Sequence, residues 1–257
     1  QNTNGYQRIS SYPGNSSQFG PIVYTTSDGT ASGTDGFEPA FVMIKATNFG
    51  SNADWVIFDN KRDPDNKRRL FLYANSGADD GNASSLEINF YSNGFQPIGS
   101  DGTHNGSGTT YLYLAIAADP YTTTPTVANS FGITLNTSPT TNQSVATTFK
   151  PDLTWIKGYN ETSGNPMSWG QYDLLRGSGE ALQTDNTDAQ FDYYYHSPGN
   201  NLGMEFSDNG YITPPQVNNN INNSLDEFVS YFWKLGGTQT INNDGTSTSV
   251  ITANAAS

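Results

Sequence analysis

The sequence predicts an all-β protein made of two tandem β-sandwich domains of the jelly-roll type. Three observations support this fold class: a composition rich in strand and turn residues, four motifs that occur twice in the same order, and short apolar runs between polar turns. No run of ten or more residues has the apolar spacing of an amphipathic helix, whereas short strands separated by polar turns are typical of sandwiches and jelly rolls.

The composition indicates folded domains without cysteine or histidine chemistry. Of the 257 residues, 13% are aromatic and 14% are charged, against about 25% charged in an average globular protein. The aromatic rings supply enough apolar area to offset the entropy of ordering the chain. Cysteine is absent and two histidines occur. This excludes disulfides and thiolate sites, and it leaves almost no material for a histidine triad or a multi-histidine metal site.

The charge balance disfavours nucleic acid and membrane partners. Eleven Lys and Arg face 24 Asp and Glu, a formal net charge of −13, and such a surface repels phosphate backbones and anionic lipids. No window approaches the roughly 20 apolar residues of a membrane span, and no signal peptide pattern is present. Because the sequence begins with Gln1, we expect an excerpt of a longer chain or a processed product.

The chain contains an internal repeat whose motifs return at offsets that grow from 112 to 117 residues. The paired segments are Phe37–Lys45 and Phe149–Lys157, Trp55–Arg62 and Trp169–Arg176, Phe90–Phe95 and Phe206–Tyr211, and Tyr111–Ile116 and Phe228–Trp233. We therefore predict one β-sandwich repeat over residues 1–120 and a second over 121–237. Residues 238–257 are expected to be a linker toward a further domain.

Period-two alternation and turn residues predict the strands of each repeat. In the first repeat they are expected at Phe41–Lys45, Trp55–Phe58, Leu70–Tyr73, Leu86–Tyr91 and Tyr111–Ala117, and in the second repeat at Leu153–Lys157. Alternation within Leu86–Tyr91 puts Ile88 on one face and Glu87 on the other. The dipeptides Asn93-Gly94 and Asn209-Gly210 predict hairpins, because both residue types tolerate the positive φ of a type I′ turn.

Aromatic residues at matching positions of the two repeats are expected in or beside the two cores. They are Trp55, Phe90, Trp155, Trp169 and Phe206.

The motifs resemble a repeat found in tail and appendage proteins of phages, especially aquatic ones. The resemblance lies in GFEPAFVMIK, WVIFDNKRDPDN, FYSNGF and SGTTYLYLAIA of the first repeat, and in FKPDLTWIKG, YDLLRG, FSDNGY and VSYFWKLGG of the second. It covers about Tyr6 to Gly237 and implies a concanavalin A-like or laminin-G-like jelly roll. It also implies a structural component of a virion tail fibre or appendage, facing the exterior and displayed for host-surface attachment. Expected partners are copies of the chain, other virion proteins and host surface polysaccharide.

An Asp-x-x-Arg motif occurs in both repeats, as Asp59 with Arg62 and as Asp173 with Arg176. An acid and a guanidinium three residues apart at a strand end can pair while closing a turn. The alternative is a contact to a sugar or carboxylate. Recurrence in both copies favours the structural role, because grafted sites usually diverge faster than scaffolding.

A basic segment is the one notable positive field of this acidic chain. Five of the 11 basic residues lie within nine positions, namely Lys61, Arg62, Lys67, Arg68 and Arg69. They can pair within the loop, bind a neighbouring subunit's carboxylates or contact an acidic glycan. The interleaved Asp63 and Asp65 argue against a polyanion site.

Tyr193, Tyr194 and Tyr195 form a second candidate glycan contact, because tyrosine supplies amphipathic area at small entropic cost. The favoured alternative is that alternate members of this run face the core of a strand. For metals, the oxygen-rich loops at Asp79 and Asp80 and at Asp185 and Asp188 are candidates for Ca²⁺. Neither fits the twelve-residue calcium loop, and turn formation by the side-chain oxygens is the alternative. No other cofactor is expected.

Three functional hypotheses follow from these residues. No pair of carboxylates stands out as the acid and base that glycoside hydrolysis needs, so we do not expect an enzyme. The leading hypothesis is a non-enzymatic virion component, followed by a glycan-binding adhesin and then a polysaccharide depolymerase. Exposed sheet edges favour lateral contacts, so we expect a homo-oligomer, and the resemblance to phage fibre proteins implies a trimer.

Overall fold

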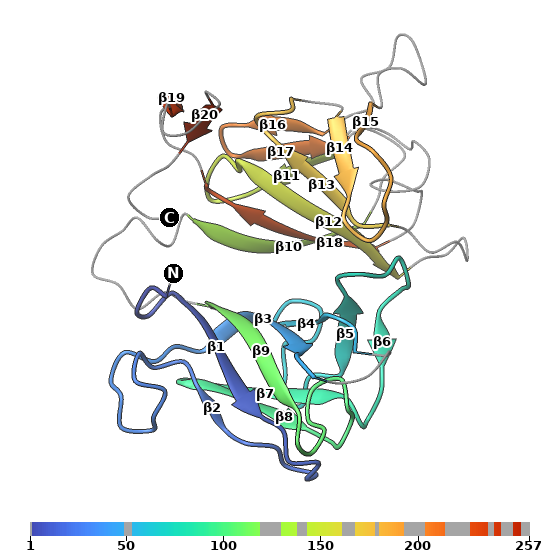
Figure 1. The fold of residues 1–257 in the computed structure, drawn as a ribbon. Helices are drawn as coiled ribbons and strands as arrows, with labels where there is room; N and C mark the ends of the chain where they lie inside the picture. Colours follow the sequence, from blue (N-terminus) through green and yellow to red (C-terminus); the bar gives the residue numbers. More distant parts are fainter. Residues whose placement is uncertain are drawn as a thin grey trace. The chain divides into compact units, whose positions relative to one another are not determined.

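A computed structural model describes residues 2–48, 53–118, 130–137, 143–160, 168–177, 180–192, 204–213, 227–235, 239–242 and 249–252. Within these residues the chain forms strands and no helix, so the predicted all-β class is confirmed. No described segment is a helix long and apolar enough to cross a membrane. The chain divides into two compact units, Gln1–Thr123 and Thr124–Ser257 (Figure 1).

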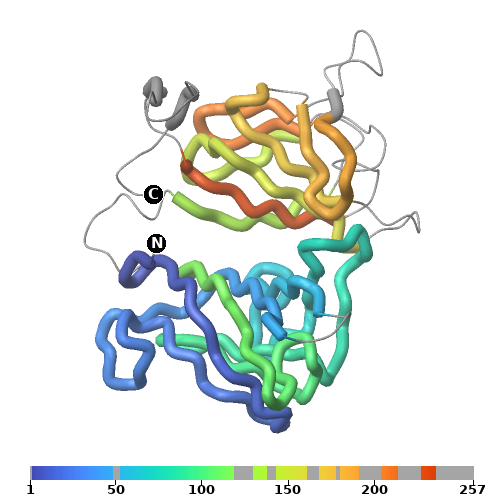
Figure 2. The backbone as a smooth tube through the Cα atoms, viewed as in Figure 1, coloured from blue at the N-terminus to red at the C-terminus, as the bar shows by residue number. Residues whose placement is uncertain are grey.

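The first unit consists of two antiparallel sheets. Its strands are β1 (Gln7–Pro13), β2 (Val23–Tyr24), β3 (Pro39–Ala46), β4 (Val56–Asp59), β5 (Leu70–Tyr73), β6 (Gly81–Asn82), β7 (Glu87–Tyr91), β8 (Gly94–Ile98) and β9 (Thr110–Ala117). The six-stranded sheet has the order β1-β9-β3-β4-β5-β6, and the three-stranded sheet has the order β2-β8-β7. Figure 2 shows the two ends of this unit running side by side as β1 and β9, with Gln7 opposite Ile116.

The second unit repeats this strand order. Its strands are β10 (Phe131–Thr137), β11 (Gln143–Ala146), β12 (Leu153–Asn160), β13 (Gly170–Asp173), β14 (Glu180–Gln183), β15 (Phe191–Asp192), β16 (Glu205–Ser207), β17 (Gly210–Thr213) and β18 (Glu227–Trp233). One sheet has the order β10-β18-β12-β13-β14-β15 and the other β11-β17-β16. Each strand from β10 to β18 therefore has a counterpart at the same place in the first unit.

Each unit buries apolar side chains between its two sheets, as a β-sandwich does. In the first unit, Val42 and Phe58 of the six-stranded sheet share one core with Ile88 and Phe95 of the three-stranded sheet. The Phe95 ring meets Tyr113 of β9 edge to face at 5.0 Å, an arrangement that adds to the burial energy of the two rings. In the second unit, the core joins Ile156, Tyr172 and Phe228 to Val145 and Tyr211 of the smaller sheet.

The two predicted hairpins form, but their glycines have a different role from the predicted one. Tyr91 pairs with Gly94, so Ser92 and Asn93 make the turn and Gly94 begins β8. A Cβ atom on Gly94 would lie 2.1 Å from the carbonyl oxygen of Val23 in β2. In the second unit, a Cβ on Gly210 would lie 2.0 Å from the Val145 carbonyl oxygen. Close approach of a neighbouring strand therefore requires glycine at both places.

The expected aromatic core residues separate into two groups. Phe90 is buried in the first core, and Phe206 packs against the second. Trp155 alternates with the inward-facing Ile156 and so lies on the opposite face of its sheet. There its ring lies 4.3 Å from that of Trp169. Trp169 is fully buried, so the expected burial holds for this ring, although alternation along β12 places Trp155 on the sheet face opposite the core that joins the two sheets.

Trp55 is the clearest exception, since it is 37% exposed. Its backbone is held by the turn that follows β5, because its N–H donates to Asn75 Oδ1 at 2.9 Å and its carbonyl accepts the N–H of Ala74 at 2.8 Å. Its ring lies under the Lys45 ammonium, 5.8 Å from Nζ to the centroid. This residue therefore fixes the start of β4 through its backbone rather than through burial of its ring.

Two further expectations differ from the structure. Glu87, assigned by alternation to the polar face, is only 2% exposed. The segment 238–257, expected to be a linker, contains a hairpin of β19 (Gln239–Asn242) and β20 (Ser249–Thr252), with Gln239 opposite Thr252. Short polar segments of this kind carry no apolar alternation, which is why the sequence pattern did not indicate the pair.

Candidate functional site

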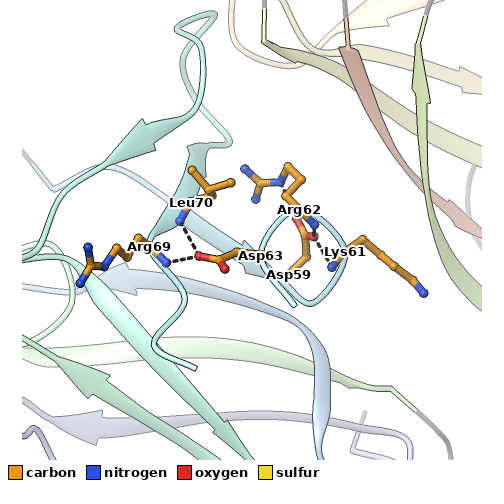
Figure 3. Close-up of polar contacts among 6 residues, drawn as sticks. All are labelled: Asp59, Lys61, Arg62, Asp63, Arg69 and Leu70. Carbon is orange, nitrogen blue, oxygen red and sulfur yellow. Dashed lines mark hydrogen bonds and ion pairs between the residues drawn. The ribbon is translucent and has the colours of Figure 1, made fainter. Parts of the chain in front are cut away.

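The Asp-x-x-Arg motif of the first unit closes the turn that follows β4 (Figure 3). Asp59 Oδ1 accepts the backbone N–H groups of Lys61 at 2.9 Å and Arg62 at 2.8 Å. Its other oxygen pairs with Arg62 Nε at 2.6 Å, and both side chains are fully buried. One carboxylate thus holds two turn amides and one guanidinium, a set of charge-assisted bonds that secures the local geometry.

The second unit repeats the turn with a more exposed pair. Asp173 Oδ1 accepts the N–H groups of Leu175 at 3.1 Å and Arg176 at 3.0 Å, and Oδ2 pairs with the Arg176 guanidinium. Arg176 Nε also donates to Gln190 Oε1 at 3.1 Å. In both units the recurring acid and base bond to each other and to their own turn.

The basic segment, residues 61–69, is organised by acids from inside and outside its own loop. Asp63 Oδ2 accepts the N–H of Arg69 at 2.6 Å and that of Leu70 at 3.4 Å, which ties the two ends of the loop together. Figure 3 shows the Lys61 side chain extending away from Asp59, to which only its backbone N–H is bonded. Lys61 is exposed, so its charge faces solvent.

Glu87 of β7 is the main anchor of the segment, and the sequence analysis did not single it out. Its Oε1 lies 2.7 Å from Arg69 Nε, and its Oε2 lies 3.9 Å from Lys67 Nζ. The carboxylate is buried while the two bases are about half exposed. The pairing joins residues that are distant in the chain, so no local spacing could have indicated it.

Arg68 is a buried structural residue rather than a surface contact. Its Nη2 donates to the Pro64 carbonyl at 2.8 Å, and its guanidinium lies 4.3 Å from the centroid of the Phe90 ring. Its backbone exchanges two hydrogen bonds with Ile88 of β7, at 2.9 and 3.0 Å. Burial lowers the pKa of its guanidinium, while nearby acids, Glu38 foremost, act in the opposite sense. The predicted external contacts therefore fall mainly to Lys61 and Lys67.

His104 is fully buried and ties the loop before β9 to the smaller sheet. Its Nε2 lies 3.0 Å from the Glu87 carbonyl oxygen and 3.1 Å from that of Ile98, and its Nδ1 lies 3.2 Å from that of Asp101. Burial lowers the pKa of the imidazole, and the backbone contacts to the carbonyls oppose the shift. The ring serves as a structural tie between β7, β8 and this loop.

The remaining candidates do not form a metal centre in the described part of the chain, where no three His, Asp or Glu side chains gather around a common point. Asp79 and Asp188 are exposed, and Asp80 is half-buried. The Asp188 N–H donates to Asn186 Oδ1 at 2.9 Å. Burial raises the pKa of Asp185. Hydrogen bonds from Trp169 and Ser168 and the charge of Lys157 lower it, but by less than burial raises it. Tyr193, Tyr194 and Tyr195 lie outside the described residues.

These features define a tandem β-sandwich protein whose recurring charged residues close turns inside each domain. The model of a family described as a domain of unknown function, DUF7483, matches residues 1–120 and residues 129–257. The chain belongs to this family, and its second matched region includes the β19–β20 hairpin. Comparisons with curated proteins and with solved structures gave no match.

Proposed function

We propose that the chain is a structural component of a phage tail fibre or appendage, displayed on the virion for host-surface attachment. The observation that carries the structural part is the duplicated turn, since Asp59 with Arg62 and Asp173 with Arg176 close the same turn in both domains. Residues that recur in this way serve a repeated scaffold. The phage setting rests on the resemblance of the repeated motifs to tail and appendage proteins.

The proposal includes no catalytic activity and no cofactor. A general acid or base must be able to reach substrate and exchange a proton. Asp59, an acid that recurs in both repeats, is fully buried and bonded to Arg62. Glu87 of β7, the buried acid that anchors the basic segment, is bonded to Arg69 and Lys67. These carboxylates hold the loop together and have no role in chemistry on a substrate.

Immunogold electron microscopy tests the location. Antibodies raised against the recombinant chain are applied to purified particles of the source phage, and we expect gold label on the tail or its appendages. Antibody pre-absorbed with the recombinant chain is the control. Particles without label, together with strong signal from infected-cell extract, would contradict the virion assignment.

A second assay addresses catalysis separately. The chain is incubated with the host surface polysaccharide, and released reducing ends are measured against a buffer blank. We expect no release above the blank. Release that scales with protein concentration would replace the structural proposal with a depolymerase.

A further inference from the structure

The first unit contains an open cleft at the side of its sandwich. The cleft lies between β1, an edge strand of the six-stranded sheet, and β2, an edge strand of the three-stranded sheet. It has a volume of about 180 Å³, and its polar lining includes Arg8, Ser10, Ser11, Tyr24 and Tyr113. Pockets for drug-sized ligands span roughly 300–1,000 Å³. This cleft therefore fits one small ring rather than a larger ligand.

Arg8 places a positive charge in this cleft. Its Nε donates to the Tyr113 hydroxyl at 3.1 Å, and its Nη1 donates to the Ser27 carbonyl at 2.8 Å. These neutral partners fix the orientation of the guanidinium without cancelling its charge. Among the described residues, the ion pairs of Arg62, Arg69 and Arg176 each include a carboxylate, whereas none includes Arg8. A positioned guanidinium of this kind matches the planar geometry of a carboxylate.

The second unit serves as an internal control for this arrangement. Strand register matches Arg8, Tyr24 and Tyr113 of the first unit with Gly132, Ala146 and Ser230 of the second. At Gly132 a Cβ atom would lie 2.3 Å from the Phe232 ring, so no side chain fits there. The same sandwich is thus built without the guanidinium or the two tyrosines. The sandwich fold does not require the guanidinium, which favours a ligand as the reason for Arg8, whereas Tyr113 also packs in the first core.

The free edge of β1 is poorly suited to an extended peptide. A peptide that adds a strand needs a row of free backbone groups at the sheet edge. The Ile9 N–H already donates to Asn2 Oδ1 at 2.6 Å, and the Gln7 N–H donates to the Thr3 carbonyl at 3.0 Å. Pro13 has no N–H, and proline is one of the devices that protect edge strands. The cleft therefore suits a ligand that binds through side chains.

We propose that this cleft binds a single acidic sugar residue, with Arg8 holding its carboxylate and Ser10, on the same face of β1 as Arg8, within the lining that contacts its ring. The net charge of −13 disfavours a uniformly charged polyanion. The ligand is accordingly an occasional uronic acid residue in a largely neutral polysaccharide. The site stands whether or not the chain belongs to a virion, because it rests on the first domain alone.

Ligand-observed NMR titration of the full chain tests the proposal with methyl glucuronide, and with methyl glucoside as the neutral match. We expect the glucuronide to bind at least about tenfold more tightly, because a charge-assisted pair is lost in the glucoside. Arg8→Gln is expected to abolish this preference. Lys61→Gln is the control, because it removes a positive charge from an exposed side chain of the same domain. We expect this variant to retain the preference for the glucuronide.

Three results would overturn the proposal: no binding of the glucuronide, equal binding of both sugars, or an unchanged preference in Arg8→Gln. Equal affinity for N-acetylglutamate would replace the sugar site with a general carboxylate site. Because Arg8→Gln could lose folding contacts, its melting curve is compared with that of the parent chain. Arg8→Lys keeps the positive charge but loses the planar guanidinium with its paired N–H donors. We expect this variant to weaken glucuronide binding at least about threefold while the chain remains folded.

Discussion

Asp59 and Asp173 occupy the same position in the two repeats but differ in exposure. The side chains of Asp59 and Arg62 are 0% exposed, whereas those of Asp173 and Arg176 are 14% and 31% exposed. Removing one partner of a buried pair leaves the other charge without compensation, while a partly exposed charge regains water. The same motif should therefore contribute unequally to the stability of the two domains.

Asp→Asn substitutions test this difference, since Asn keeps an oxygen for the turn amides and loses the charge. We expect Asp59→Asn to lower the free energy of unfolding by roughly 3–5 kcal/mol and Asp173→Asn by about 1–2 kcal/mol. Urea denaturation followed by tryptophan fluorescence measures both. Asp65→Asn changes an exposed acid of the same loop and should stay within about 0.5 kcal/mol. Equal losses at the two motif positions would contradict the role of burial.

His104 should make the first domain sensitive to mild acid. Because burial lowers the pKa of His104 in the folded state, the unfolded chain binds the proton more readily. Stability is then complete above the ordinary histidine pKa of about 6.5 and falls as the pH drops below it. We expect a slope of up to about 1.4 kcal/mol per pH unit below roughly pH 6.5.

Denaturation curves at several pH values check this expectation. In His104→Gln the slope in that window should disappear, although the overall stability falls because the buried contacts are lost. His196→Gln removes the other histidine of the chain and controls for a general histidine effect. A slope that persists in His104→Gln would assign the acid sensitivity to other groups.

At the scale of the elements, the three-stranded sheet of each sandwich contains a glycine at which a neighbouring strand of the same sheet passes closely. Gly94 begins β8 and Gly210 begins β17, and each faces a carbonyl oxygen of the adjacent strand. Any side chain at these positions would have to displace β2 or β11. The conserved geometry in both units indicates that strand spacing, rather than turn conformation, selects glycine.

Gly94→Ala should therefore cost about 1–3 kcal/mol through overpacking. The turn residue next to it, Asn93, is only half-buried, and Asn93→Ala should change stability by about 0.5 kcal/mol or less. Thermal and urea denaturation of both variants measure the difference. If Asn93→Ala proved as costly as Gly94→Ala, the turn conformation rather than the close strand approach would be the controlling feature.

At the scale of the whole molecule, the chain combines two copies of one sandwich with a net charge of −13. Such a charge keeps free copies soluble and opposes their association. Lys61, Lys67 and Arg69 are the exposed bases of the basic segment, and Lys61 in particular is available to the acidic surface of another copy. Association of the chain should therefore depend on ionic strength.

We predict a homo-oligomer, most simply a trimer. Its association should become tighter from about 0.01 to 0.1 M salt, because the screening length falls from about 30 to 10 Å and the repulsion between the acidic copies weakens. Sedimentation velocity at micromolar concentration measures the state. Lys61→Glu should weaken the association, because it adds repulsion at the proposed contact. A monodisperse monomer at every salt concentration would defeat the prediction.

The sequence by itself determined the features that depend on nearby residues. The all-β class follows from a period of two along each strand, and the duplication follows from motifs that can be compared directly. Contacts over three residues, such as that of Asp59 with Arg62, lie within reach of spacing arguments. The two hairpins at Asn93 and Asn209 were also predictable, although the role of their glycines was not.

The tertiary structure decided what depends on residues distant in the chain. Alternation shows that a strand has two faces, but packing of the second sheet decides which face is the core, and the exposure of Trp55 was not predicted for this reason. Glu87 neutralises Arg69 from another strand. The Arg8 cleft exists because β1 lies beside β9, which brings Arg8 to Tyr113. Strand pairing between residues about a hundred positions apart creates these sites, and the spacing of residues near in the sequence cannot predict it.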